Sequence, residues 1–124
     1  MKRRSVLNGR IFSIFGLYDA ALLNQDKYKD KLEKTVQTLA DNLEKYDMKF
    51  WTKYDQSGNV ASPAYHDLHI KQMKIMYELF GEQRFLMFAQ KCEKYQKNAL
   101  YKGFAVFIKA QQKIFSKSEM VITK

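Results

Sequence analysis

Residues 27–46, KYKDKLEKTVQTLADNLEKY, decide the fold class of this chain. Apolar side chains recur there at intervals of three or four residues, and charged or polar side chains fill most positions between them. The apolar positions are Tyr28, Leu32, Val36, Leu39, Leu43 and Tyr46. An α-helix places residues with this spacing on one face. The stretch therefore predicts an amphipathic helix over 27–46, with Asp26 as its N-cap.

The same spacing continues on both sides of this stretch and predicts an all-α fold. Further helices are expected over about 6–24 and 65–80, and the apolar stripes at 85–95 and 100–115 predict a fourth and a fifth. Five glycines and one proline in 124 residues leave few helix breakers. The first two helices should form an antiparallel hairpin because the link between them is short. Residues 116–124 are expected to be frayed.

Residues 47–63 interrupt the helical pattern. Aromatic side chains are dense at 50–54, and the polar stretch 55–59, DQSGN, is typical of a turn. Pro63 suits the first turn of the next helix, and Gly81 is placed to end that helix as a C-terminal cap. We therefore expect one short aromatic β-hairpin or ordered loop between the second and third helices.

The net charge of +9 bears on partners more than on fold. Such a chain attracts polyanions, so nucleic acid, an anionic membrane surface and an acidic polysaccharide are all compatible with it, as is a merely solvated lysine-rich surface. The basic residues are spread along the chain and do not gather on one helix, which argues against nucleic acid.

Targeting signals and disulfides are not expected. The apolar run at 11–23 contains Asp19 and follows Asn8 and Arg10, so it predicts neither a secretory signal nor a membrane span. Cys92 is the single cysteine, which leaves no internal disulfide framework and favours a reducing compartment. We expect a cytoplasmic protein.

Both histidines follow the aromatic loop. His66 and His69 are three residues apart and share one face of the predicted helix. That spacing suits a metal ion, but no third ligand lies nearby in the sequence, so no metal site is predicted. The alternative is that the two imidazoles form hydrogen bonds to the loop backbone and brace it.

Tyr54 and Tyr65 are the candidate acid/base pair. A tyrosine hydroxyl with a pKa near 10 ordinarily donates a proton, and it becomes a base only where a cation such as Lys53, Lys71 or a protonated His69 lowers that pKa. Two tyrosines on opposite faces of a substrate can remove a proton on one side and return one on the other. The alternative is a pair of half-buried rings whose hydroxyls face water.

Four blocks of sequence resemble the C-terminal domain of D-glucuronyl C5-epimerases. They are LNG at 7–9 with FSIFGLYD at 12–19, the spacing of Thr38, Leu39, Leu43, Tyr46 and Asp47, WTKYD at 51–55, and YHDLHIKQM at 65–73. Their order and spacing follow the family over about residues 6–97. The sequence beyond Leu100 shows no such resemblance.

The resemblance implies antiparallel helical hairpins that form part of an α/α-toroid. It places residues 1–124 in a single helical domain with an extra C-terminal helix at 98–116. It also implies an isomerase that converts D-glucuronate to L-iduronate within heparosan-type or heparan-type chains, by removing and returning the proton at carbon 5. Acidic polysaccharide is then the expected partner, and no cofactor is implied.

Carried over by position, the resemblance makes Tyr54 and Tyr65 catalytic. Around them, we expect substrate binding by Asn8, Trp51, Lys53, His66 and His69. Trp51 suits stacking on a sugar face, and its alternative is a place in the loop core.

The sequence also departs from the family. A further family tyrosine and its adjacent glutamate precede the Leu-Asn-Gly block, where this chain has only residues 1–5, and Pro63 and Ala64 replace an arginine and an aromatic of animal members. About five helices do not close a toroid, so we expect a homodimer or a separate chain that carries the N-terminal half. The alternative function is a non-catalytic helical module that binds acidic polysaccharide.

Overall fold

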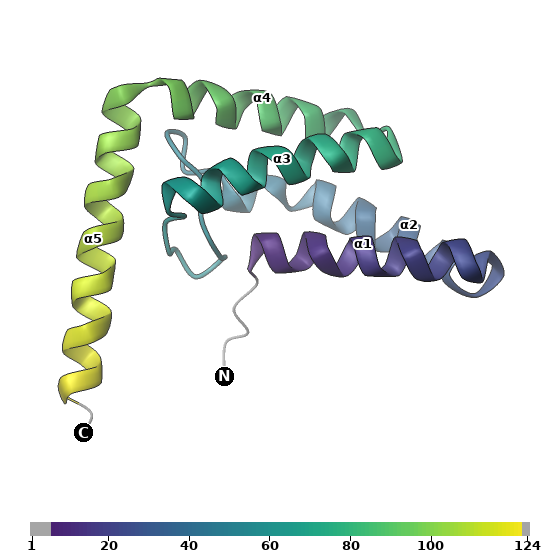
Figure 1. Ribbon diagram of the computed structural model, residues 1–124, viewed down its shortest axis with the longest axis horizontal. Helices are drawn as coiled ribbons and strands as arrows, with labels where there is room; N and C mark the ends of the chain where they lie inside the picture. Colours follow the sequence, from purple (N-terminus) through teal and green to yellow (C-terminus); the bar gives the residue numbers. More distant parts are fainter. Residues whose placement is uncertain (1–5, 123–124) are drawn as a thin grey trace.

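The structure, a computed structural model, describes residues 6–122, with side chains described as far as Phe115. Within that range it is helical and contains no β-sheet, as the sequence predicts. The elements are α1 (Leu7–Leu23), α2 (Gln25–Asp41), the 3-10 helix η1 (Leu43–Tyr46), α3 (Pro63–Phe80), α4 (Gln83–Lys97) and α5 (Ala99–Ile122), shown in Figure 1.

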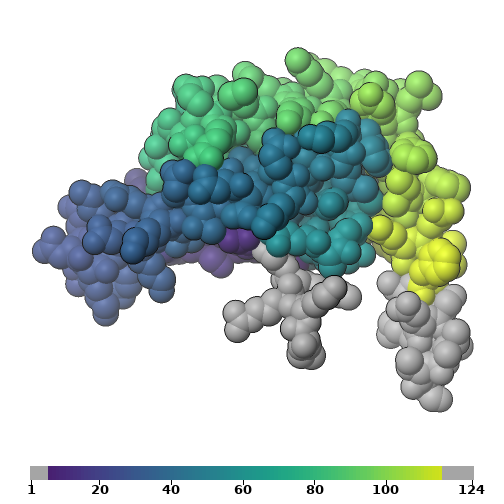
Figure 2. All heavy atoms as spheres, turned by 180° about the vertical axis from the view of Figure 1, so that it is seen from behind, coloured from purple at the N-terminus to yellow at the C-terminus, as the bar shows by residue number. Residues whose placement is uncertain are grey.

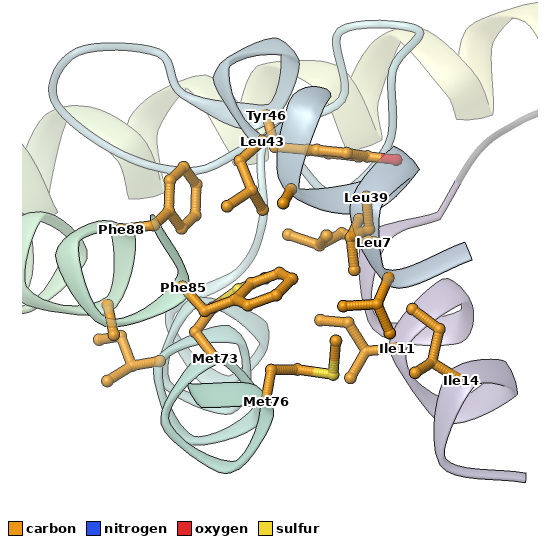
Figure 3. Close-up of a cluster of buried hydrophobic side chains, with 14 of the residues drawn as sticks. Leu7, Ile11, Ile14, Leu39, Leu43, Tyr46, Met73, Met76, Phe85 and Phe88 are labelled. Atoms are coloured by element: carbon orange, nitrogen blue, oxygen red, sulfur yellow. The ribbon is translucent and has the colours of Figure 1, made fainter. Parts of the chain in front are cut away.

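The first four α-helices form two hairpins. In Figure 1, α1 and α2 run side by side, α3 and α4 do the same, and α1 also contacts α3. Aliphatic, aromatic and thioether side chains from both hairpins fill the space between them. Figure 3 shows Leu7, Ile11 and Ile14 facing Leu39, Leu43, Tyr46, Met73, Met76, Phe85 and Phe88. The predicted antiparallel hairpin is confirmed, whereas membership in a toroid stays a prediction.

The ends of α2 differ from the prediction because asparagines define them. The side chain of Asn24, and not that of Asp26, accepts a hydrogen bond from the Lys27 N–H, so the helix begins two residues early. At the other end the Asn42 side chain donates to the Thr38 carbonyl at 2.6 Å and competes with the helical backbone pattern. The α-helix therefore ends at Asp41, and 43–46 continues as η1.

The ends of α3 follow the prediction. Pro63 occupies the first turn, after an N-cap at Ser62 that accepts from the Tyr65 N–H. Gly81 ends the helix with a φ of 71°, a left-handed conformation that glycine adopts without steric cost. These two caps fix where Tyr65 and both histidines sit on the first turns of α3.

Residues 47–62 form an ordered loop. Isolated antiparallel bridges join Asp47 to Thr52, Lys53 to Val60 and Val6 to Asp55 in place of continuous strands. The Leu7 N–H donates to the Tyr54 carbonyl at 3.1 Å, which ties the loop to the start of α1.

Helix α5 leaves α4 in a new direction after Asn98, whose side chain caps it by accepting from the N–H groups of Leu100 and Tyr101. Figures 1 and 2 show α5 at one end of the molecule, beside the loop. The helix runs to Ile122, so the expectation of a frayed tail from 116 is wrong for the described backbone, and residues 123–124 lie outside it. No helix within 6–122 is long and apolar enough to cross a membrane.

Candidate active site

The two predicted catalytic tyrosines lie in contact. Tyr54 comes from the loop and Tyr65 from the first turn of α3, and their ring centroids are 4.9 Å apart with the planes inclined by 66°. Tyr65 is 39% exposed and Tyr54 is half-buried. Neither ring is sealed in the interior, so the pair forms part of the surface.

A tight turn holds Tyr54 in place. The Tyr54 N–H donates to the Asn59 carbonyl at 2.6 Å. Within the turn, the Asp55 carboxylate accepts hydrogen bonds from Ser57 and Asn59, through both backbone and side-chain donors. Burial alone would raise the pKa of Asp55, but these hydrogen bonds outweigh it and lower the pKa. Asp55 is therefore an ionised structural group that shapes the turn.

Helix α5 adds a cation to the tyrosine pair. Lys109 places its ammonium group over the Tyr54 ring, 5.6 Å from the centroid. Gln112, nearly one helical turn further on, fixes the position of the helix. Its side chain accepts from the Val60 N–H at 2.9 Å and donates to the Gly58 carbonyl at 3.1 Å.

Trp51 and His66 stack in the interior, and Tyr54 packs against the hydrophobic cluster that contains Trp51. The side chains of Trp51 and His66 are fully buried, and their rings stack with centroids 3.8 Å apart and planes 15° from parallel. The indole N–H of Trp51 donates to the Ala61 carbonyl at 2.9 Å. Trp51 thus occupies the loop core, the alternative that the sequence left open, and a sugar does not reach it in this conformation.

Thr52 links the two histidines. Its Oγ1 lies 2.8 Å from Nδ1 of His66 and 3.1 Å from Nδ1 of His69. Nε2 of His66 lies 2.9 Å from the Cys92 carbonyl and must donate to it. In neutral His66, Nδ1 therefore accepts the Thr52 hydroxyl proton, and His69 donates its Nδ1–H to Thr52.

Both histidines are held neutral. Burial lowers the pKa of His66, although the bond to the Cys92 carbonyl opposes the shift. Burial, and then repulsion by His66, lowers the pKa of His69 to about 3. The rings brace the loop, as the bracing alternative proposed, but through the Thr52 side chain and the Cys92 carbonyl.

Three buried side-chain atoms, one on α1 and two on α3, have no hydrogen-bond partner among the described residues: Asn8 Oδ1, His69 Nε2 and Gln72 Oε1. Gln72 also donates to the Asn8 carbonyl at 3.4 Å, which joins α3 to α1. The tautomers derived above make His69 Nε2 a lone-pair acceptor. This junction favours a hydrogen-bond donor such as water.

The structure thus brings Tyr54 and Tyr65 together at the surface, leaves Lys53 half-buried, and places Trp51 and both histidines inside. Sequence reasoning missed Thr52, Lys109 and Gln112. No local signal marks Lys109, because its place at the site depends on how α5 packs. Among the described residues, no three His, Cys, Asp or Glu side chains gather to hold a metal ion.

A separate groove lies away from the tyrosine pair. A concavity of about 560 Å³ opens between α1, α2 and the end of α3, and its lining includes Leu22, Leu32 and Phe80 but neither tyrosine. Its walls hold a single tyrosine among the described residues together with further titratable side chains, namely Tyr18, Lys29, Glu33 and Glu82. We assign the chemistry to the tyrosine pair because the titratable hydroxyls and the cation meet there.

The fold and the site define a class of protein: a domain of helical hairpins in which an interhelical loop and the helix after it each present one tyrosine of a contacting pair. The family model described as D-glucuronyl C5-epimerase C-terminus matches residues 1–94 of the chain. The chain belongs to that family, since the match covers most of its 124 residues. No curated protein and no solved structure matches the chain.

Proposed function

We propose that the chain supplies acid/base groups for an isomerase that converts D-glucuronate to L-iduronate within heparosan-type or heparan-type polysaccharide. One observation carries the proposal: Tyr54 and Tyr65 lie in contact at the surface, with ring centroids 4.9 Å apart, in a chain of the C5-epimerase family. The net charge of +9 suits an acidic polymer.

The proposed reaction moves only protons. One tyrosine, as the phenolate, takes the proton from carbon 5, and the electrons of that C–H bond move into the adjacent carboxylate to give an enolate-like dianion. The other tyrosine then donates its hydroxyl proton to the opposite face of carbon 5, which inverts the centre. No electrons are gained or lost overall, so the proposal requires no redox cofactor.

This mechanism requires the two tyrosine rings to move apart when the substrate binds. The two rings touch, so a sugar ring does not fit between them as they stand. Tyr65 is the more exposed of the two and lies on the first turn of α3, so it is the ring that can swing outward on binding. We propose that substrate entry parts the rings and places one hydroxyl on each face of the uronate.

The other predicted site residues take two kinds of role in this proposal. Lys53 is half-buried and suits direct contact with the acidic polymer. Trp51, His66 and His69 are fully buried, so they position the loop and do not touch the substrate. Asn8 lies at the junction of α1 and α3, where its buried side-chain oxygen is open to a donor.

The proposal is tested in heavy water with heparosan as substrate. The chain is assayed alone and together with a chain that carries the upstream glutamate and tyrosine expected from the family resemblance. Mass spectrometry or proton NMR then detects deuterium at carbon 5 and the appearance of iduronate. Deuterium uptake in either arrangement supports the proposal. Salt-sensitive binding of heparosan with no uptake in both arrangements contradicts it and favours the non-catalytic binding module.

A further inference from the structure

We propose that Lys109, on the C-terminal helix α5, binds the carboxylate of the uronate whose carbon 5 faces the tyrosine pair. This inference rests on the proposed function, because it assigns a specificity residue to the same site. It adds a group that lies outside the part of the chain matched by the family, which ends at residue 94.

Two observations define the position of Lys109: its contact with the Tyr54 ring, and the attachment of its helix to the loop. Its ammonium group lies 5.6 Å from the centroid of the Tyr54 ring, and that ring contacts Tyr65. The two hydrogen bonds of Gln112 to the backbone of residues 58 and 60 hold α5 against the same turn that carries Tyr54. Figure 2 shows the yellow-green part of α5 beside the blue-teal loop. The Gln112 hydrogen bonds therefore keep the part of α5 that carries Lys109 next to the turn that follows Tyr54.

Lys109 has no carboxylate partner among the described residues. It takes part in none of their ion pairs. Asp55 is near enough to favour its charge, but both oxygens of that carboxylate already accept hydrogen bonds from the turn. Burial, and then repulsion by Lys113, lowers the pKa of Lys109. A partly desolvated ammonium group that forms no direct ion pair with any described residue favours binding of an anion.

The proposed reaction brings the carboxylate of the uronate close to Lys109. The proton that moves is on the carbon next to the uronate carboxylate, so a phenol that reaches carbon 5 has the carboxylate within a few ångströms. Loss of the proton adds charge to that carboxylate, and a fixed cation beside it stabilises the enolate-like dianion. Lys109 supplies this cation on the Tyr54 side of the pair.

Binding of a heparosan oligosaccharide, measured by isothermal titration calorimetry with the whole chain, tests the inference. Lys109→Gln is compared with Lys34→Gln, an exposed lysine of α2 that removes the same charge far from the loop. We expect Lys109→Gln to weaken binding by about tenfold or more, Lys34→Gln by less than about twofold, and Lys109→Arg to restore most of the affinity. With a carboxyl-reduced oligosaccharide, the wild type and Lys109→Gln should bind equally.

Each other outcome is decisive. If the wild type binds heparosan and Lys109→Gln binds equally well, the assignment of Lys109 is overturned while the proposed function stands. An equal loss in Lys109→Gln and Lys34→Gln also overturns it, because only overall charge then matters. If the wild type does not bind heparosan either alone or together with the upstream chain, both the proposed function and this inference fail. Circular dichroism of each variant verifies that the helices remain folded.

Discussion

At the scale of single residues, the Thr52 hydroxyl connects the loop to α3. It has one proton to donate, and it lies within hydrogen-bond distance of two imidazole nitrogens. Because His66 donates to the Cys92 carbonyl, the network is satisfied with both rings neutral. Protonation of either ring adds a charge to a buried site where, among the described residues, neither ring forms a hydrogen bond to a carboxylate.

The free energy of unfolding should fall as the pH drops below the ordinary histidine pKa of about 6.5. The folded-state pKa of His69 is lowered to about 3, so between these values the unfolded chain binds a proton that the folded chain does not. Above about pH 6.5 the neutral His69 does not lower the free energy of unfolding. Below that pH the free energy of unfolding falls by about 1.4 kcal/mol per pH unit, down to about pH 3. His66, whose pKa is also lowered, should steepen the loss.

Urea denaturation at pH 7.5 and pH 5 measures this effect. His69→Asn is the matched variant, because its side-chain N–H can still donate to Thr52 but does not titrate. We expect a pH-dependent loss of about 2 kcal/mol or more in the wild type and a clearly smaller loss in His69→Asn. Equal losses in the two proteins would show that His69 does not bind the extra proton.

The sequence identified the tyrosines and histidines at this scale but not their connections. Residue type and spacing singled out Tyr54, Tyr65 and the His66–His69 pair, since few side chains carry such chemistry. The link through Thr52 depends on where the loop crosses α3, and spacing along the chain does not contain that information. For the same reason the burial of Trp51 was one of two open alternatives.

At the scale of secondary-structure elements, two glycines should respond to alanine in opposite directions. Gly81 caps α3 with a φ of 71°. A residue with a Cβ is strained in this backbone conformation, although no other atom lies within 4 Å of the position that a Cβ would take. Gly16 lies within α1, is exposed and likewise has no neighbour within 4 Å. Gly81→Ala should therefore destabilise the fold by about 1 kcal/mol, whereas Gly16→Ala should stabilise it by about 0.5–1 kcal/mol.

Thermal and urea denaturation of the two variants checks this pair. The comparison separates backbone conformation from side-chain packing, because neither added methyl group meets another atom. A stabilising Gly81→Ala change would contradict the left-handed cap.

Gln112 should determine how firmly α5 is attached to the loop. Gln112→Ala removes both hydrogen bonds to the loop backbone and leaves the N–H of the buried Val60 without its partner. We expect a loss of about 1–2 kcal/mol and faster hydrogen exchange of the Val60 amide. Gln111→Ala, at an exposed position of the same helix, should change stability by less than about 0.5 kcal/mol. Equal exchange rates in the two variants would contradict the contact.

The helices themselves were predictable, because the apolar spacing of 27–46 and its neighbours reflects the same burial that the structure shows. The ends of α2 were not. The prediction selected Asp26 as the cap and extended the helix to Tyr46, but the side chains of Asn24 and Asn42 compete more effectively for the backbone. Local hydrogen bonding by asparagine does not appear in a hydrophobic pattern.

At the scale of the whole molecule, the site joins segments that are distant in the sequence. The start of α1 holds the Tyr54 carbonyl, α3 supplies Tyr65, and α5 supplies Lys109. The family resemblance singled out Tyr54 and Tyr65 but neither the contact of α1 with the loop nor the part taken by α5, which begins beyond the matched residues. The homodimer or separate N-terminal chain stays a prediction.

The most direct measurement is deuterium incorporation at carbon 5 of heparosan by Tyr54→Phe and Tyr65→Phe, compared with the wild type in the arrangement that supports exchange. Tyr101→Phe is the control, because Tyr101 is 40% exposed, close to the 39% of Tyr65, and lies on α5. We predict uptake reduced by at least about a hundredfold in the first two variants and unchanged in the third. Uptake that survives the loss of either hydroxyl would contradict the assignment of the tyrosine pair.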